Sequence, residues 1–248
     1  MALKRRLKKI AEKLTGTHIF LRMPFGVSVA HDISRRFPGY RLDVIFDVGA
    51  NVGQSALRYA STYPASTIYC FEPVKETFDQ LTRNVAGKKQ IICCNVALSD
   101  YVGDGTMISN GTSVMNRLVD EDGKAGFKSQ ETEQVHVSTV DTFCESSNIA
   151  RISYLKVDAE GGDLDVLAGS RGILQRHGVD MVEVEAGMNP GNKRHVPLES
   201  LKGFLEGLGF FVFGIYAQVS ELQRKEPHLR RANAVFISEA MIRDSSEK

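Results

Sequence analysis

The sequence predicts an α/β fold around a mostly parallel sheet of seven strands. Short apolar runs alternate with helical patterns along most of the chain, in the order that a doubly wound sheet requires. The clearest unit begins at Ile45, where an apolar run breaks at Asp47 into a turn with Gly49 and Gly53 and then into a helical pattern. At 248 residues and 42% hydrophobic, the chain can bury one large core without splitting.

The other elements follow in order. Thr67 to Glu72 has the β-branched and aromatic residues of a strand, and Pro73 suits the first turn of the next helix. Ser138 to Asp141 has the spacing of a helix-start box. Only a basic loop separates the last two strands, so we expect them to be antiparallel. After the first strand, the predicted strands are 67–72, 90–95, 152–157, 181–185, 210–216 and 233–237, and the predicted helices are 54–63, 74–85, 143–147, 163–177 and 198–208.

Residues 101–137 interrupt this alternation. They are rich in Gly, Ser, Thr, Asn and Asp and are too long for an ordinary connection. We expect a flap with a short hairpin that pairs 105–108 with 134–137, in a position typical of an active-site lid. Polar flap residues are often only solvated, but those that could contact a substrate are Asn110, Ser113 and Asn116.

The glycine turn and a following acid indicate a ligand that carries a nucleoside. Glycines let the backbone approach such a ligand, and Glu72, 19 residues after Gly53, can accept hydrogen bonds from ribose hydroxyls. A dinucleotide turn would need Gly-x-Gly-x-x-Gly, whereas Asn51 holds the second glycine position here. Asp47, two residues before the first glycine, suits instead a cationic ligand such as S-adenosylmethionine.

Three sequence blocks carry a family resemblance. They are 46–53 (FDVGANVG) with 71–73 (FEP), 95–100 (NVALSD), and 155–161 (LKVDAEG) running into 166–169 (VLAG). Through these blocks the chain resembles the FkbM family of S-adenosylmethionine-dependent methyltransferases, over roughly residues 40 to 240. The resemblance implies a Rossmann-like class I methyltransferase fold and S-adenosylmethionine as cofactor.

The resemblance also implies roles for individual cofactor residues. Asp47 and the turn 49–53 should border the methionine part of the cofactor, and Glu72 should bind the ribose. The alternative to cofactor binding is that Asp47 caps a helix and that Glu72 is an exposed strand end. Residues after the third strand should lie near the adenine, although such polar residues also form ordinary turns. The predicted cofactor-binding residues are Asp47, Gly49, Ala50, Asn51, Gly53, Glu72, Asn95, Ser99 and Asp100.

Acidic residues after the fourth strand and on the fifth are candidate catalytic groups. Ligands of open α/β sheets bind beyond the carboxyl ends of the strands, where Asp158 lies. Glu160 could contact the substrate, hold a divalent metal together with Asp158, or complement a helix N-terminus. Glu183 or Glu185 should face the site, and one of them could pair with Lys156. The residues predicted to accept the substrate proton are Asp158, Glu185 and His195, although a loop histidine is often merely exposed.

Charge is balanced overall but uneven along the chain. A formal net charge of +1 disfavours nucleic acid as a partner. We expect a basic helical segment at 1–40, with nine Lys and Arg, ahead of a methyltransferase domain at 41–248. An amphipathic helix in 1–15 could contact an anionic membrane or a lipid-linked saccharide, but docking onto the domain or onto a second subunit of a homo-oligomer is the preferred interpretation. Its apolar residues, which precede a stop at Gly16, are Leu3, Leu7, Ile10 and Leu14.

Cysteine usage and hydropathy predict a cytoplasmic protein. The four cysteines show no metal-binding spacing and fit reduced core thiols. The N-terminus lacks the pattern of a signal peptide, and no apolar run is long enough to span a bilayer. The cysteines are Cys70, Cys93, Cys94 and Cys144.

The function predicted from these features is methylation of a hydroxyl on a sugar, a polyketide or another small biosynthetic intermediate, glycosylated and lipid-linked forms included. The acceptor class comes from the resemblance alone. Methylation of nucleic acid is an alternative that the basic N-terminal segment favours and the near-neutral charge opposes. A non-catalytic nucleoside-binding partner protein is a third, which the intact Asp47, Glu72 and Asp158 oppose. A dinucleotide oxidoreductase is weakest, because the glycine spacing is wrong.

Overall fold

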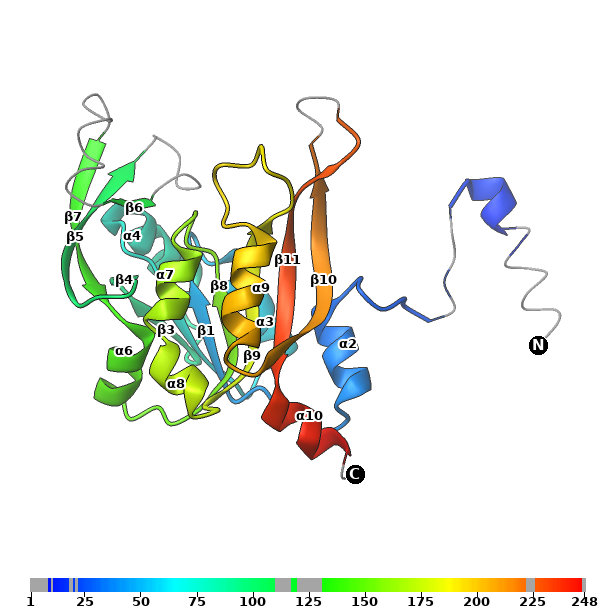
Figure 1. The fold of residues 1–248 in the computed structure, drawn as a ribbon, viewed down its shortest axis with the longest axis horizontal. Helices are drawn as coiled ribbons and strands as arrows, with labels where there is room; N and C mark the ends of the chain where they lie inside the picture. The colour runs from blue at the N-terminus through cyan, green and yellow to red at the C-terminus, as the bar shows by residue number, and fades with distance from the viewer. Residues whose placement is uncertain are drawn as a thin grey trace.

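The computed structural model of the chain describes residues 9, 11–17, 20, 22–109, 117–119, 131–221 and 226–246. Its centre is a sheet of seven strands, with β11 antiparallel to both neighbours and all other pairs parallel (Figure 1). The predicted mostly parallel sheet with an antiparallel last strand is thereby confirmed. In order across the sheet, the strands are β10 (Phe210–Ser220), β11 (Leu229–Ser238), β9 (Val179–Gly187), β8 (Ile152–Val157), β1 (Val44–Val48), β2 (Thr67–Phe71) and β3 (Ile91–Cys94).

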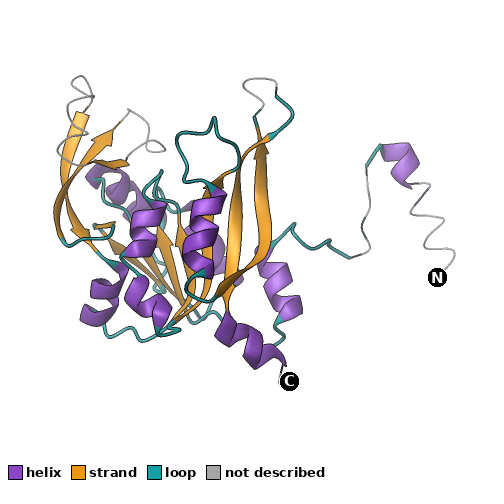
Figure 2. Cartoon of the chain, viewed as in Figure 1, coloured by secondary structure: helices purple, strands orange, loops and turns teal. Residues whose placement is uncertain are grey.

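Helices cover both faces of this sheet (Figure 2). Alternate residues of a strand point to opposite faces, so Leu155 and Val157 of β8 join one apolar cluster and Tyr154 joins the other. Burial on both faces explains why the parallel strands read as nearly continuous apolar runs. The first cluster packs against α6 (Val140–Ser146), α7 (Asp163–Ala168), α8 (Arg171–Gln175) and α9 (Leu198–Glu206), and the second against α2 (Val29–Arg36), α3 (Gln54–Thr62), α4 (Lys75–Asn84) and α10 (Glu239–Ser246).

The interruption after β3 contributes a second, smaller sheet. Its strands in order are β4 (Ala97–Leu98), β7 (Glu131–Ser138), β5 (Gly103–Ser109) and β6 (Arg117–Val119). The predicted hairpin forms between β5 and β7, but Gly105 pairs with Val135 instead of Val137. A shift of two residues keeps each side chain on its expected face, so the pattern alone could not fix the register. The flap residues that lie outside the described part of the chain are Asn110, Ser113 and Asn116.

The long helix predicted from Asp163 onward is wrong, because the chain breaks at Gly169 between α7 and α8. A Cβ on Gly169 would lie 1.9 Å from the carbonyl oxygen of Ser99, so this point packs directly on the chain after β4. The Asp141 carboxylate accepts hydrogen bonds at 2.7 Å from the backbone N–H of Gly172 and of the next residue, and so caps α8. Both contacts join segments far apart in the sequence.

Part of the N-terminal segment packs on the main sheet. Ser28 caps α2, and Ile33 of that helix is buried in the core. Residues 11–15 are helical and stop at Gly16 as predicted, but they lie away from the sheet, with Leu14 81% exposed (Figure 1). The division of the chain at residue 40 stays a prediction. The remaining apolar residues of the predicted helix lie outside the described residues, and they are Leu3, Leu7 and Ile10.

Two further findings concern membrane-spanning helices and the cysteines. No helix in the described ranges is long and apolar enough to cross a membrane. All four cysteines are free thiols, with Cys70 and Cys144 buried and Cys93 and Cys94 partly exposed.

Candidate active site

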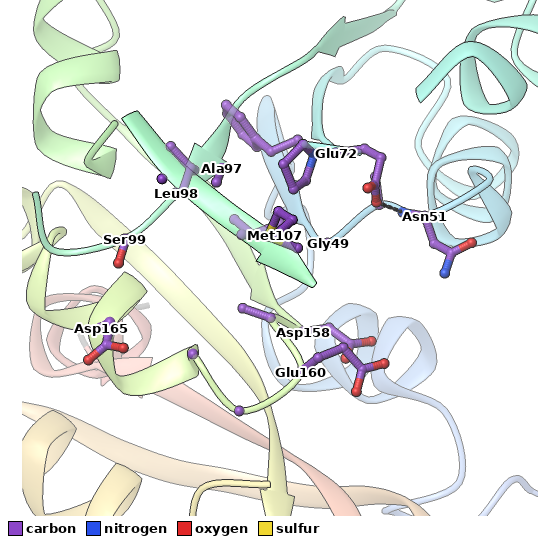
Figure 3. A pocket seen from close by; sticks show the side chains of 18 of the residues that line it. Gly49, Asn51, Glu72, Ala97, Leu98, Ser99, Met107, Asp158, Glu160 and Asp165 are labelled. Carbon is purple, nitrogen blue, oxygen red and sulfur yellow. Dashed lines mark hydrogen bonds between the residues drawn. The ribbon is translucent and has the colours of Figure 1, made fainter. Parts of the chain in front are cut away.

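A cleft of about 1070 Å³ lies at the carboxyl ends of the parallel strands (Figure 3). The segments that follow β1, β2, β8 and β9 form its floor and one wall, and the small sheet adds Thr106, Met107 and Gln134. This is the position where open α/β sheets bind ligands. Its volume matches the upper end of the roughly 300–1,000 Å³ found for small-molecule sites, so there is room for more than one small ligand.

The glycine turn after β1 forms one end of the cleft. Gly49, Ala50 and Asn51 line it, and Gly49 adopts a φ of 72°. A Cβ on Gly49 would lie 2.0 Å from the carbonyl oxygen of Asp158. Position 49 therefore requires glycine because the loop after β8 approaches it so closely. This reason comes in addition to the predicted close approach of a ligand. Gly53 does not line the cleft and packs instead against α4 at the start of α3, so its contact with the cofactor stays a prediction.

Glu72 reaches the cleft from the end of β2, as predicted. Its Oε2 accepts a hydrogen bond from the Asn51 N–H at 3.1 Å (Figure 3), and its Oε1 accepts one from the Val74 N–H at 3.0 Å. These bonds fix the carboxylate beside the glycine turn and leave lone pairs available to other donors. Burial raises the pKa of Glu72 to about 7. The geometry fits a hydrogen-bond acceptor for a ribose diol.

Asp47 does not border the cleft, contrary to the prediction. Its side chain is fully buried on β1, and Lys156 on β8 places its Nζ 3.1 Å from Asp47 Oδ1. Lys156 itself lines the cleft and also lies 3.4 Å from Asp158 Oδ2. The sequence pattern identified Asp47 as important but could not show that a lysine from the neighbouring strand would separate it from the ligand.

The residues predicted near the adenine divide into two groups. Ser99 and Asp100 line the cleft, next to Asp165 of α7. Asn95 does not line it, and its side-chain amide instead donates to the backbone oxygens of Glu72 (2.9 Å) and Pro73 (2.8 Å). The prediction for Asn95 as a direct contact is therefore replaced by a supporting role for the turn that carries Glu72.

The loop after β8 presents Asp158 and Glu160 to the cleft. The Asp158 side chain is 34% exposed, whereas Glu160 is bound by the Arg194 guanidinium, whose Nε lies 2.7 Å from Glu160 Oε2. Asp163, which starts α7, accepts hydrogen bonds from the N–H groups of Ala159 (3.4 Å) and Gly161 (3.2 Å) and so caps this loop. Burial raises the pKa of Asp163 to about 7. Asp158 is thus the carboxylate of this loop that is left for a substrate.

His195 lines the cleft, but both of its ring nitrogens face oxygen acceptors. Nε2 lies 2.7 Å from Glu185 Oε2, and Nδ1 lies 3.0 Å from Asn192 Oδ1. The Asn192 amide is oriented by its own bonds, since Nδ2 donates to the Arg230 carbonyl oxygen and Oδ1 accepts from the Arg194 N–H. The hydrogen bonds of this site are therefore best satisfied when both ring nitrogens carry a hydrogen and donate it.

This arrangement opposes the predicted role of His195 as a base. Burial, and then the Arg194 charge, lower the pKa of His195, but a neutral ring would turn a lone pair toward one of the two oxygens. The Glu185 carboxylate, 2.7 Å from Nε2, favours the doubly protonated ring, which has no lone pair to accept a proton. Glu185 does not line the cleft and also pairs with Arg231, so the structure opposes it as a base as well. Glu183 lies outside the cleft too and accepts hydrogen bonds from Tyr154 and Asn233.

The residues considered for a divalent metal do not fit one. Across the described ranges, no three side chains of His, Cys, Asp or Glu are grouped so that they could hold a metal ion. Glu160 is already neutralised by Arg194, and Asp158 lies beside Lys156.

Several cleft residues were not identified from the sequence as site residues. Thr106, Met107 and Gln134 come from the small sheet, Arg194 directly precedes His195, and Lys156 was considered only as a partner of Glu183 or Glu185. The one available signal was the block 155–161, in which Lys156 stands two residues before Asp158.

The strand order and the site together define a class of protein. A Rossmann-like sheet with an antiparallel last strand, a glycine turn after β1 and an acid at the end of β2 are the features expected of a class I methyltransferase. Comparison with known families makes the assignment specific: the methyltransferase FkbM domain matches residues 47–212, and the chain belongs to this family. The predicted methyl transfer with S-adenosylmethionine as cofactor is thereby confirmed.

Named relatives cover different shares of the chain. Methyltransferase 1 of Beauveria bassiana is 32% identical over 187 residues, which is 68% of this chain and 72% of that protein. Hexuronic acid methyltransferase AglP of Haloferax volcanii is 30% identical over 154 residues, 60% of this chain and 58% of its own length. The 31-O-demethyl-FK506 methyltransferase FkbM of Streptomyces tacrolimicus is 29% identical over 157 residues, 51% of this chain and 59% of its own length. The chain thus spans less than two thirds of the last two relatives.

Solved structures show more distant likeness. EvdMO1 has a TM-score of 0.46 and 14% identity, with 97% of this chain and 49% of that chain covered. TrmK of M. capricolum, solved with S-adenosyl-homocysteine, has a TM-score of 0.47 and 9% identity, with 86% and 70% covered.

The side chains at one end of the cleft fit the cofactor. The buried Glu72 carboxylate can take the ribose hydroxyls, and the backbone of 49–51 can border the methionine part. Ser99 and Asp100 stay predictions for the adenine end. None of these contacts needs Asp47, Gly53 or Asn95.

Proposed function

We propose that this methyltransferase methylates a hydroxyl of a sugar, a polyketide or another small biosynthetic intermediate that carries no phosphate groups, and that Asp158 accepts the hydroxyl proton. The observation that carries the proposal is the Asp158 carboxylate, which lies at the carboxyl end of β8, lines the cleft and is 34% exposed. The other acid considered as a base, Glu185, does not line the cleft and is shared between His195 and Arg231.

The charge of the cleft supports an acceptor without phosphates. Among the described residues that line it, six are carboxylic acids and three are Lys or Arg. Such a lining repels a polyanion, because opposed like charges cost free energy in a partly desolvated site. This observation disfavours the nucleic-acid alternative. The acids are Glu72, Asp100, Asp104, Asp158, Glu160 and Asp165, the Lys and Arg residues are Lys156, Lys193 and Arg194, and His195, protonated beside Glu185, is a further cation.

The names of the relatives point in the same direction. They include a hexuronic acid methyltransferase, a 2-O-methyltransferase and a 31-O-demethyl-FK506 methyltransferase. Each name belongs to a protein that this chain covers only in part, so the acceptor class is carried over as a proposal.

The chain's residues would divide the work of the reaction. S-adenosylmethionine, when bound, supplies an activated methyl group. Glu72 and the turn 49–51 orient its nucleoside and methionine parts, and Met107 from β5 helps to exclude water. Asp158 takes the hydroxyl proton as the acceptor oxygen is methylated, a role for which a carboxylate in hydrogen-bond reach suffices.

Transfer of a labelled methyl group to a panel of acceptors tests this proposal. The panel pairs neutral sugars, hexuronic acids and hydroxylated polyketides with phosphorylated sugars and RNA. We expect transfer only to members without phosphate, and a loss of roughly 10²–10⁴-fold in kcat for Asp158→Asn with S-adenosylhomocysteine binding retained. Methylation of RNA or of a phosphorylated sugar would overturn the acceptor class, and full activity of Asp158→Asn would overturn the role of Asp158.

Finer points of the prediction remain proposals. A glycosylated or lipid-linked acceptor, a peripheral membrane contact through residues 1–15 and a homo-oligomer each rest on the sequence pattern alone. The exposed Leu14 at 81% is consistent with docking of this segment onto another surface. The free thiols are consistent with the predicted cytoplasmic location, since reducing compartments keep cysteines unpaired.

A further inference from the structure

Three charged side chains lie side by side on three neighbouring strands below the cleft. Asp47 of β1 is in register with Lys156 of β8, and Lys156 is in register with Glu183 of β9. The residues two positions before each of them all belong to the apolar cluster on the α3 side of the sheet. Charges in such a place cost free energy unless they are paired. The partners of each charged side chain therefore indicate its role.

Lys156 is the counter-charge of Asp47. The Asp47 carboxylate is fully buried, and no hydrogen-bond donor within the described residues satisfies its oxygens apart from the Lys156 ammonium at 3.1 Å. Glu183 has other partners, since it accepts hydrogen bonds from Tyr154 and from Asn233 Nδ2 at 2.5 Å. Burial alone would lower the pKa of Lys156, but the carboxylates of Asp47, Asp158 and Glu183 raise it instead. Lys156 thus stays charged.

The same ammonium group also reaches the cleft. Its Nζ lies 3.4 Å from Asp158 Oδ2, and the Lys156 side chain is 7% exposed while that of Asp158 is 34% exposed. Lys156 is the cation with which Asp158 pairs in the described part of the chain. The ionisable groups near Asp158 also include the acids Glu160 and Asp163 on its own loop and helix, which both feel its negative charge, and the cation Arg194 and His195, which line the same cleft.

Like charges disfavour the ionised form, and an opposite charge within about 4–6 Å favours it by on the order of 1–3 pH units. A proton acceptor must be ionised when the substrate binds. The arrangement of Asp47, Lys156 and Asp158 supplies that condition.

We propose that Lys156 is a positioning residue for the methyl transfer: tethered by the buried Asp47, its ammonium group keeps the Asp158 carboxylate ionised and fixed at the edge of the cleft. The inference rests on the proposed role of Asp158. It also gives Asp47 a function, as the anchor of Lys156, that differs from contact with the cofactor.

The test is a carbon-13 NMR titration of the aspartate carboxyl carbons in the full chain. The Asp158 signal is assigned by its loss in Asp158→Asn. In Lys156→Met, its titration midpoint should rise by about 1–3 pH units, and the acid limb of kcat/KM should move with it. Lys202→Met is the matched control, because Lys202 lies on the exposed side of α9 and pairs with Glu206. It should leave both values unchanged.

A second variant guards against misfolding. Removal of Lys156 alone strands the buried Asp47 charge, so Asp47→Asn combined with Lys156→Met removes both charges and should fold, bind S-adenosylhomocysteine and show the same rise. An unchanged midpoint in a variant that still binds S-adenosylhomocysteine would overturn the proposal. The titration needs no acceptor. A midpoint that rises while Asp158→Asn stays fully active would instead remove Asp158 from the chemistry and leave its pairing with Lys156 intact.

Discussion

Gly49 offers a quantitative test of how the cleft is built. In Gly49→Ala, the new Cβ would lie 2.0 Å from the Asp158 carbonyl oxygen and 3.0 Å from its carbonyl carbon. Both atoms are backbone and cannot rotate away. A non-glycine residue at the observed φ of 72° costs about 1–2 kcal/mol, and forced displacement of a packed segment costs about 1–3 kcal/mol. We therefore expect a loss of about 2–5 kcal/mol, a large share of the roughly 5–15 kcal/mol that stabilises a typical domain.

Urea denaturation measures this loss, as a lower midpoint at an unchanged m-value. Gly203→Ala is the control, because Gly203 lies within α9 and a Cβ there meets nothing within 4 Å. The control should gain about 0.5–1 kcal/mol, since alanine is the better helix former. Binding of S-adenosylhomocysteine should also weaken in Gly49→Ala, because the Asp158 loop must move. A Gly49→Ala protein as stable as wild type would refute the account of this turn.

Three further predictions concern the site and its support. Affinity for S-adenosylhomocysteine should rise about tenfold from pH 6 to pH 8, because the pKa of Glu72 is about 7 and ribose hydroxyls prefer the ionised acceptor; a flat calorimetric profile would contradict this. His195→Gln should lower methyl transfer less than about tenfold, because both ring nitrogens are already engaged, whereas loss of a true base would cost roughly 10²–10⁴-fold. Asp141→Ala should cost about 0.5–2 kcal/mol in thermal or chemical unfolding by removing the cap of α8, and an unchanged stability would show that Asp141 is dispensable there.

Much of the fold could be predicted because its signals are local. The parallel strands are buried on both faces, so they appear as apolar runs, and the turn between β1 and α3 carries its glycines at fixed spacing. Glu72 was identified for the same reason, since it stands at the end of a recognisable strand. The antiparallel pair β10 and β11 followed from the short loop between them.

Most of the errors depend on contacts between distant segments. The break at Gly169 is imposed by the carbonyl of Ser99, about seventy positions earlier, and by the cap from Asp141. Asp47 has the spacing of a cofactor residue, but its carboxylate forms an ion pair with a lysine on the adjacent strand. His195 has the sequence surroundings of a mobile loop histidine and yet is 6% exposed. Which partner a charged side chain finds is decided by tertiary packing, which no local pattern encodes.

The slip in the small sheet has a different origin. Register along β5 and β7 is equally compatible with a shift of two residues, because the side-chain period of a strand is two. Because β6 lies between β5 and β7 in the chain and pairs with β5, no single turn joins β5 to β7 and fixes their register.

The measurement that tests the central claim most directly is calorimetric binding of S-adenosylmethionine and S-adenosylhomocysteine to the wild-type chain and to Glu72→Gln, with NAD as control. Glu72→Gln keeps the shape of the side chain and removes the charge that takes the ribose diol. We predict binding of both methionine nucleosides, none of NAD, and a loss of about 10–100-fold in the variant, as expected when charge-assisted hydrogen bonds worth about 1.5–3 kcal/mol are removed. Equal binding by wild type and variant, or a preference for NAD, would contradict the account of this cleft.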